Sequence, residues 1–219
     1  MDLFDLIGPI MVGPSSSHTA GAVRIGLACR RILGEDVAEA EVTLSGSFAA
    51  TGSGHGTDRA IIAGLLGMKP DDRRIPESFE TAKERALKFS FISEDMPAAH
   101  PNTARLRLRG VGGAETDIEA ASLGGGRIEI RRIGDMPLSF SAEQPTLVIR
   151  NVDRLGIVAG GSSVMAEEKI NMASFNVNRS SRGGSAVMVI ELDTPLNAAV
   201  MERVRALPGV LRAVYIEQD

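Results

Sequence analysis

The sequence contains a single cysteine, Cys29, among 219 residues. One thiol cannot close a disulfide within the chain, and it cannot supply the several ligands that a zinc ion or an iron-sulfur cluster requires. Any such metal group would need ligands from another chain, so we assign no metal ligand here. Cys29 lies in an apolar helical pattern, which favours a buried small side chain over a nucleophile.

Lysine is also scarce. The chain has four, and none lies in a convincing cofactor pocket: Lys69, Lys83, Lys88 and Lys169. This scarcity argues against an enzyme that forms a Schiff base between a lysine and pyridoxal phosphate.

A basic block and a long apolar run are both missing. The 24 Lys and Arg nearly balance the 28 Asp and Glu, which gives a net charge of -4, so nucleic acid is not an expected partner. No apolar run approaches the length of a membrane span, and residues 1–5 are acidic where a signal peptide would be basic. We therefore expect a cytoplasmic protein with no membrane partner.

What is present indicates a globular α+β protein of two domains. Hydrophobic residues make up 43% and charged residues 24%, which is enough to build a core in each half. Polar residues and a proline at Ser141–Pro145 predict a boundary there. We expect a first domain over residues 1–140 and a second over residues 146–219.

The second domain has the pattern βαββαβ, a ferredoxin-like plan. The strands are expected over residues 146–150, 172–177, 185–192 and 210–216, and the helices over 156–168 and from a cap at Thr194–Pro195 to about Leu207.

The first domain mixes helices with glycine-rich loops and strands. One helix is capped by Ser17 or Thr19 and stops at Gly34, and another is capped by Thr57 or Asp58. A strand over 39–48, an amphipathic helix over 76–89 and a strand meander over 103–140, broken at 110–113 and 124–126, complete the expected elements.

The segment Gly13–Gly21 gathers hydroxyls and one imidazole directly before a helix. Free N–H groups and the positive end of the dipole favour an anion there, so the segment suits a carboxylate. The plainer interpretation is a serine-rich helix cap with an incidental histidine, His18. The segment is no Walker loop, because it lacks the Gly-Lys-Ser/Thr ending.

A second loop, Thr51–Asp58, places His55 between two glycines at a helix start. Glycine is favoured where the backbone approaches a ligand, so His55 is not expected to be core filler. The dipole keeps an imidazole at such a position neutral, as a general base requires.

Two further motifs stay open. His100–Thr103 is typical of turn chemistry, with the histidine held in reserve as a functional residue. Ser122–Arg127 suits either close approach of a ligand or a flexible hairpin connection.

In their order and spacing these motifs resemble the β chain of iron-sulfur-dependent L-serine dehydratases, also called L-serine ammonia-lyases. The stretches that carry the resemblance are Val12–Thr19, Gly54–Asp58, His100–Thr103 and Ser122–Ile128. Asn151–Val158 resembles the first strand-to-helix turn of an ACT domain, so the similarity covers essentially the whole chain. The sequence departs from the family at Ala50–Ser53, where relatives often carry Gly-Thr-Gly-Lys.

The resemblance implies one subunit of a two-chain enzyme that converts L-serine to pyruvate and ammonia. A 4Fe-4S cluster, held by the partner α chain, would act as a Lewis acid on the serine hydroxyl. His55 would remove the α-proton, His18 would assist, and the hydroxyls of Ser15, Ser16, Ser17 and Thr19 would bind the carboxylate or position the loop. A potassium requirement stays open.

The resemblance also implies an ACT regulatory domain that pairs with a second copy and binds an amino acid near Asn151, Asp153, Gly156 and Ile157. The glycine lets a ligand carboxylate approach the N–H groups at the helix start. A dimerisation surface without a ligand is the plainer interpretation.

The rival to the enzyme is a non-catalytic amino-acid-sensing protein built on the ACT domain, against which the two glycine-histidine loops speak. A metal-independent hydrolase ranks last, because no Gly-x-Ser-x-Gly elbow is present.

Overall fold

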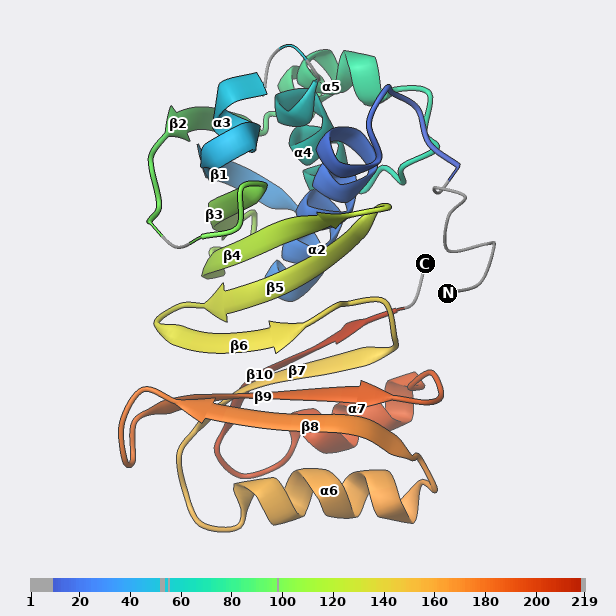
Figure 1. Ribbon diagram of the computed structural model, residues 1–219. Helices are drawn as coiled ribbons and strands as arrows, with labels where there is room; N and C mark the ends of the chain where they lie inside the picture. The colour runs from blue at the N-terminus through green and yellow to red at the C-terminus, as the bar shows by residue number, and fades with distance from the viewer. Residues whose placement is uncertain (1–9, 52–53, 55, 98, 218–219) are drawn as a thin grey trace. The chain divides into compact units, whose positions relative to one another are not determined.

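The computed structural model describes residues 10–51, 54, 56–97 and 99–217 (Figure 1). The chain divides into two compact units, Met1–Gly134 and Asp135–Asp219. The expected boundary, Ser141–Pro145, lies just C-terminal to this division. Within the described residues, no helix combines the length and the apolar character that crossing a bilayer requires.

The first unit is a mixed sheet with helices packed on it. Its elements are η1 (Ser16–Gly21), α2 (Ala22–Leu33), β1 (Val37–Leu44), α3 (Gly46–Thr51), α4 (Thr57–Leu65), η2 (Ile75–Glu77), α5 (Ser78–Glu84), β2 (Lys88–Ser93), β3 (Thr103–Gly110), β4 (Glu115–Gly124) and β5 (Arg127–Ile133). The strand order is β2-β1-β3-β4-β5, in which β1 pairs with β2 in parallel and the other neighbours are antiparallel.

Helix α2 joins the sheet to α4. It contacts β3, β4 and β5 on one side and crosses α4 on the other. The crossing is close because both helices place glycine at the contact: a Cβ on Gly26 would lie 2.3 Å from the Ile61 carbonyl oxygen, and one on Gly64 would lie 2.1 Å from the Val23 carbonyl oxygen.

Two expected elements of this unit are wrong in part. The strand expected over 39–48 ends at Leu44, and Gly46–Thr51 forms the short helix α3 instead. The helix expected over 76–89 is divided into η2, α5 and β2, because Ala86 adopts a positive φ of 57° and the chain then pairs with β1. The expected strands of the meander and the helix stop at Gly34 are confirmed.

The second unit has the element order expected from the sequence. After β6 (Met136–Phe140) come β7 (Thr146–Val152), α6 (Ile157–Glu167), β8 (Met172–Arg179), β9 (Ser185–Leu192), α7 (Ala198–Arg205) and β10 (Val210–Ile216). The strands from β7 onward form a sheet in the order β10-β7-β9-β8 with antiparallel neighbours. The βαββαβ order is confirmed, and the fold class is mixed α and β with two sheets.

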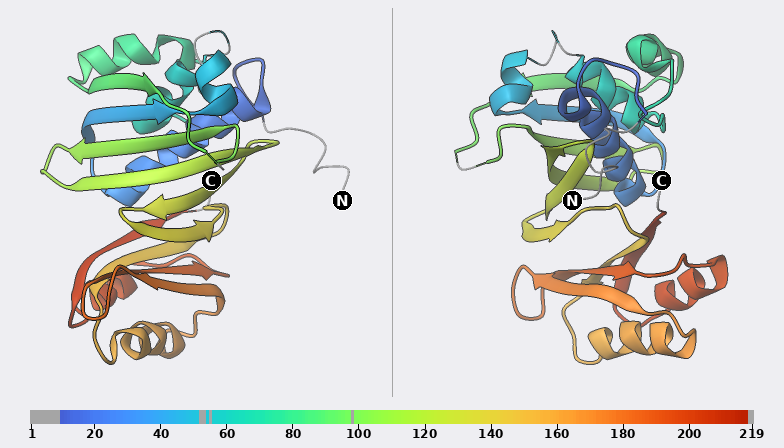
Figure 2. Two further views of the ribbon diagram at one scale, coloured as in Figure 1. Left: turned by 60° about the vertical axis from the view of Figure 1, so that its left-hand side comes forward. Right: turned by 45° about the vertical axis from the view of Figure 1, so that its right-hand side comes forward.

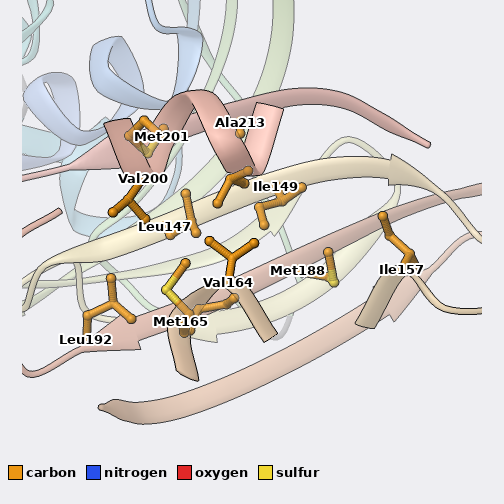
Figure 3. Packing of buried hydrophobic residues seen from close by; sticks show 12 residues of the cluster. Leu147, Ile149, Ile157, Val164, Met165, Met188, Leu192, Val200, Met201 and Ala213 are labelled. Atoms are coloured by element: carbon orange, nitrogen blue, oxygen red, sulfur yellow. The ribbon is translucent and has the colours of Figure 1, made fainter. Parts of the chain in front are cut away.

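Both helices of this unit lie on the same face of its sheet (Figure 2). Apolar side chains from the helices and the strands meet in one core, among them Leu147, Ile149, Val164, Met165 and Val200 (Figure 3). The cap of α7 differs from the expectation: Asn197, not Thr194, accepts the capping hydrogen bond, from the Val200 N–H over 3.0 Å.

Candidate functional site

The serine-rich segment forms one irregular turn before α2. Ser15, not Ser17 or Thr19, is the cap: its Oγ accepts a hydrogen bond from the His18 N–H over 3.1 Å. The carbonyl of Ser15 accepts from the N–H of Thr19 at 2.9 Å and of Ala20 at 3.4 Å. The turn is therefore widened into a π-helix, a form that is often found at functional sites.

The imidazole of His18 lies between two hydroxyl groups. Its Nδ1 is 3.4 Å from Ser15 Oγ, and its Nε2 is 3.0 Å from Ser47 Oγ. The ring meets Phe48 edge-on, with a centroid distance of 5.3 Å and an interplanar angle of 67°. A hydroxyl can either donate or accept, so this setting accommodates both neutral tautomers of His18.

The other hydroxyls of the segment have different surroundings. Thr19 is buried against Gly13, where a Cβ would lie 2.6 Å from the threonine Cγ2. The Ser17 carbonyl accepts a hydrogen bond from Ser122 Oγ over 3.0 Å. Ser16 is half-buried. Thr19 thus faces the protein interior, as a loop-positioning residue would.

The turn at His100–Asn102 makes backbone hydrogen bonds to both Ser47 and Ser122. His100 Nδ1 accepts the Asn102 N–H over 3.1 Å, which closes the turn. The Pro101 carbonyl accepts the N–H of Ser47 over 2.7 Å, and the Asn102 carbonyl accepts the N–H of Ser122 over 3.0 Å. Among the described contacts, His100 closes a turn, which is one of the two interpretations that the sequence leaves open.

The Ser122–Arg127 stretch joins the same site. Ser122 is fully buried, and a Cβ on Gly21 would lie 2.1 Å from its Oγ. Arg24 of α2 donates to the Gly126 carbonyl over 3.0 Å. The hairpin connection between β4 and β5 is therefore tied to the start of α2.

The second glycine-histidine loop is described only in part. Helix α4 is capped by Gly56, at a φ of 69°, and not by Thr57 or Asp58. The Asp58 carboxylate accepts the N–H of Arg59 over 2.7 Å. His55 lies outside the described residues, so its role stays a prediction.

Sequence reasoning missed Ser47 and Phe48. Both belong to α3, in a stretch expected to continue a strand. The signal that was present is Gly46 between two serines at the strand end, because glycine there adopts a φ of 56°.

The donor set of this chain does not fit an iron-sulfur cluster. Cys29 is fully buried in α2, and burial raises the pKa of its thiol, which disfavours the thiolate that a cluster needs. Over the described ranges, no three His, Cys, Asp or Glu side chains are grouped closely enough to hold a metal ion. Cluster ligands would have to come from another chain.

The expected effector turn lies between β7 and α6. Gly156 caps α6 with a φ of 86°, and Ile157 is buried under the turn. Asn151 is fully buried, and its amide donates to the Val152 carbonyl over 2.9 Å.

Asp153 at the same turn already has partners. Its Oδ2 accepts from the Gly183 N–H and from Arg179, each over 2.9 Å. These hydrogen bonds, the one from Gly183 first, hold the pKa of the carboxyl below its usual range. A ligand amino group at Asp153 would have to compete with Arg179.

Comparison with known proteins defines the class. The family model described as "Serine dehydratase beta chain" matches residues 2–132. The probable L-serine dehydratase, beta chain, of Bacillus subtilis is 38% identical over 214 residues, covering 98% of this chain and 97% of that protein. The L-serine dehydratase, beta chain, of Peptoniphilus asaccharolyticus is 34% identical over 215 residues, with the same coverage of 98% and 97%. This chain belongs to the serine dehydratase beta chain family.

A more distant relative carries a different name. D-3-phosphoglycerate dehydrogenase of a Synechocystis species is 23% identical over 197 residues, which cover 90% of this chain and 35% of that protein.

Proposed function

We propose that this chain is the β subunit of a two-chain L-serine dehydratase, which converts L-serine to pyruvate and ammonia in the cytoplasm. The carrying observation is the convergence of the family's motifs: Ser15, Ser17, His18, Asn102 and Ser122 meet in one hydrogen-bonded site. Membership of the β chain family over nearly the full length supports the same assignment.

In this proposal the chain supplies proton-transfer and substrate-binding groups. His55 removes the α-proton of serine, and His18 assists from its place between two hydroxyls. Ser15, Ser16 and Ser17 bind the carboxylate at the start of η1, since a helix start favours an anion. Thr19 positions the loop from inside, since its side chain packs on Gly13.

The 4Fe-4S cluster belongs to the partner α chain, because this chain has one cysteine and that thiol is buried. Assay of the assembled complex with and without added potassium tests a potassium requirement.

We assign the second unit to an ACT regulatory module that pairs with a second copy and binds serine at the turn of Asn151, Asp153, Gly156 and Ile157. The βαββαβ order and the positive φ of Gly156 at the start of α6 support this assignment. Size measurement on a fragment that starts at Asp135 tests the pairing, and a monomer would count against it.

A non-catalytic amino-acid-sensing protein is the second candidate. The similarity to a protein named D-3-phosphoglycerate dehydrogenase favours it, because 90% of this chain is then matched by a protein named for another activity. A sensor has no need of a histidine held by a hydroxyl at each ring nitrogen, so we favour the enzyme.

Anaerobic co-expression with an α chain of the family tests the assembly. We expect the two chains to co-purify with iron and sulfide, and this chain alone to bind no cluster. A stoichiometric cluster on the isolated chain would overturn the two-chain assignment, and a failure to co-purify would favour the sensor.

A further inference from the structure

We propose that Ser47 is the positioning residue of His18, and that the His100–Asn102 turn exists to hold Ser47 and the backbone beside His18 in place. The proposal rests on the proposed function only where it concerns turnover. The placement of the His18 ring itself can be measured without any activity.

The contact between the two side chains is direct. Ser47 Oγ lies 3.0 Å from His18 Nε2, and its neighbour Phe48 meets the ring edge-on at 5.3 Å. Phe48 is fully buried, so its ring is held in place beside the His18 imidazole. Ser15 Oγ, at 3.4 Å from Nδ1, is the longer and weaker contact. Of the two hydroxyls, Ser47 therefore has more influence on the ring orientation.

The position of Ser47 is set by Pro101. The Pro101 carbonyl accepts the Ser47 N–H over 2.7 Å and the Phe48 N–H over 3.4 Å. The two chains can approach this closely because residue 46 is glycine: a Cβ there would lie 2.6 Å from the Pro101 carbonyl oxygen. Gly46 also has a φ of 56°, which disfavours other residues.

The same turn also supports the backbone of Ser17, the residue before His18, through Asn102 and Ser122. The Asn102 carbonyl accepts the Ser122 N–H over 3.0 Å, and Asn102 Nδ2 donates to the Ser122 carbonyl over 3.4 Å. Ser122 Oγ in turn donates to the Ser17 carbonyl over 3.0 Å. One turn thus supports both the His18 ring, through Ser47, and the residue that precedes His18, through Ser122.

A hydroxyl at Nε2 suits a histidine that moves protons. The Ser47 Oγ can accept from a protonated Nε2 and donate to an unprotonated one, so the contact survives a change of protonation state. A carboxylate in this place would favour the protonated ring, and an apolar side chain would remove the hydrogen bond at Nε2. Ser47 therefore fixes the ring without fixing its charge.

The test uses the full chain labelled with nitrogen-15 in histidine. The chain has three histidines, and the signals that disappear in the His18→Gln spectrum are those of His18. Ser47→Ala removes the hydroxyl and suits a helix. Ser47→Thr keeps the hydroxyl, and Ser47→Cys offers a weaker partner. Ser90→Ala, on the exposed side of β2, is the matched control.

We expect Ser47→Ala to shift the His18 Nδ1 and Nε2 signals, Ser47→Cys to give intermediate shifts, and Ser47→Thr and Ser90→Ala to leave them near wild type. Unchanged His18 signals in a folded Ser47→Ala or Ser47→Cys chain would overturn the proposal. Shifts in Ser47→Thr as large as those in Ser47→Ala would overturn it as well.

In the complex with the α chain, a misplaced His18 should lower kcat by up to about 100-fold with less change in KM, and Ser47→Thr should restore it. If the His18 signals shift while kcat is unchanged, Ser47 positions the ring as proposed and the role of His18 in turnover is wrong. The two failures are therefore distinguishable.

Discussion

The hydroxyl of Ser122 donates a hydrogen bond to the carbonyl oxygen of Ser17 over 3.0 Å, which joins β4 to the turn that carries His18. The same hydroxyl lies under Gly21, where a Cβ would be 2.1 Å away. The close approach of these two segments depends on the absence of a side chain at Gly21.

Gly21→Ala should therefore disturb the His18 turn. We expect a loss of about 1 to 3 kcal/mol of unfolding free energy, because the added methyl must displace a buried, hydrogen-bonded side chain. Urea unfolding of the full chain measures it. Gly161→Ala is the matched control: it is buried in α6, but an added Cβ would meet only Met188 Cε at 4.0 Å, an ordinary contact, so the change should be neutral or stabilising by up to about 1 kcal/mol. Equal effects of the two changes would contradict the account.

The sequence predicts the second unit better than the first because its pattern is local. In β7 and β9, apolar runs end at polar turns, so the βαββαβ order follows from neighbours along the chain. Helix α3 depends instead on Gly46 packing against Pro101, a contact that no local pattern indicates.

The cap of the first helix could not be chosen from the sequence for a similar reason. Ser15, Ser16 and Ser17 are chemically alike, and Ser17 and Thr19 were the expected caps. Ser15 caps the turn because its Oγ accepts the His18 N–H, while Ser122, which is distant in sequence, bonds the Ser17 carbonyl. Motif identity was therefore predictable, while the contacts between motifs were not.

Asp117 gives the first unit a component of stability that depends on pH. Burial alone would raise the pKa of this carboxyl, but the hydrogen bond from Arg105 and the charge of Arg132 outweigh burial and lower it. A carboxyl with a lowered folded pKa stabilises the fold above its unfolded pKa, about 3.9, and this contribution is lost as the pH falls through the folded value.

Asp117→Asn should remove about 1 kcal/mol at neutral pH, the upper part of the range for exposed pairs, since Arg105 contacts the carboxylate with two nitrogens. The difference from wild type should shrink below about pH 4. Thermal unfolding followed across pH checks this expectation. A difference that stays constant into acid would assign the effect to packing.

His55→Gln tests the assignment of the base. Replacing a general base lowers the rate by about 100- to 10,000-fold, and we expect a loss in that range for the complex with its cluster intact. Serine-dependent pyruvate formation measures it, with iron content as the check on the cluster and Ser90→Ala as the control. Near wild-type turnover would move the role to His18 or to the partner chain.

Substitutions of Asp153 and of Arg179 should change the affinity of the effector turn for serine in opposite directions. If the amino group of serine replaces Arg179 at Asp153, then Asp153→Asn should weaken serine binding to the full chain by about tenfold or more, because a charged hydrogen bond is lost. Arg179→Ala should tighten binding, since it removes the competitor. Isothermal titration calorimetry measures both. Equal affinities in all three chains would remove Asp153 from the site.

Mixing of the separately purified chains tests whether this chain completes an L-serine dehydratase. Each purified chain and the anaerobic mixture are assayed for pyruvate formed from L-serine. We expect no activity from either chain alone, activity in the mixture, and loss of that activity when the mixture contains His55→Gln in place of the wild-type chain. Pyruvate formation by the α chain alone, at a rate that this chain does not change, would contradict this expectation.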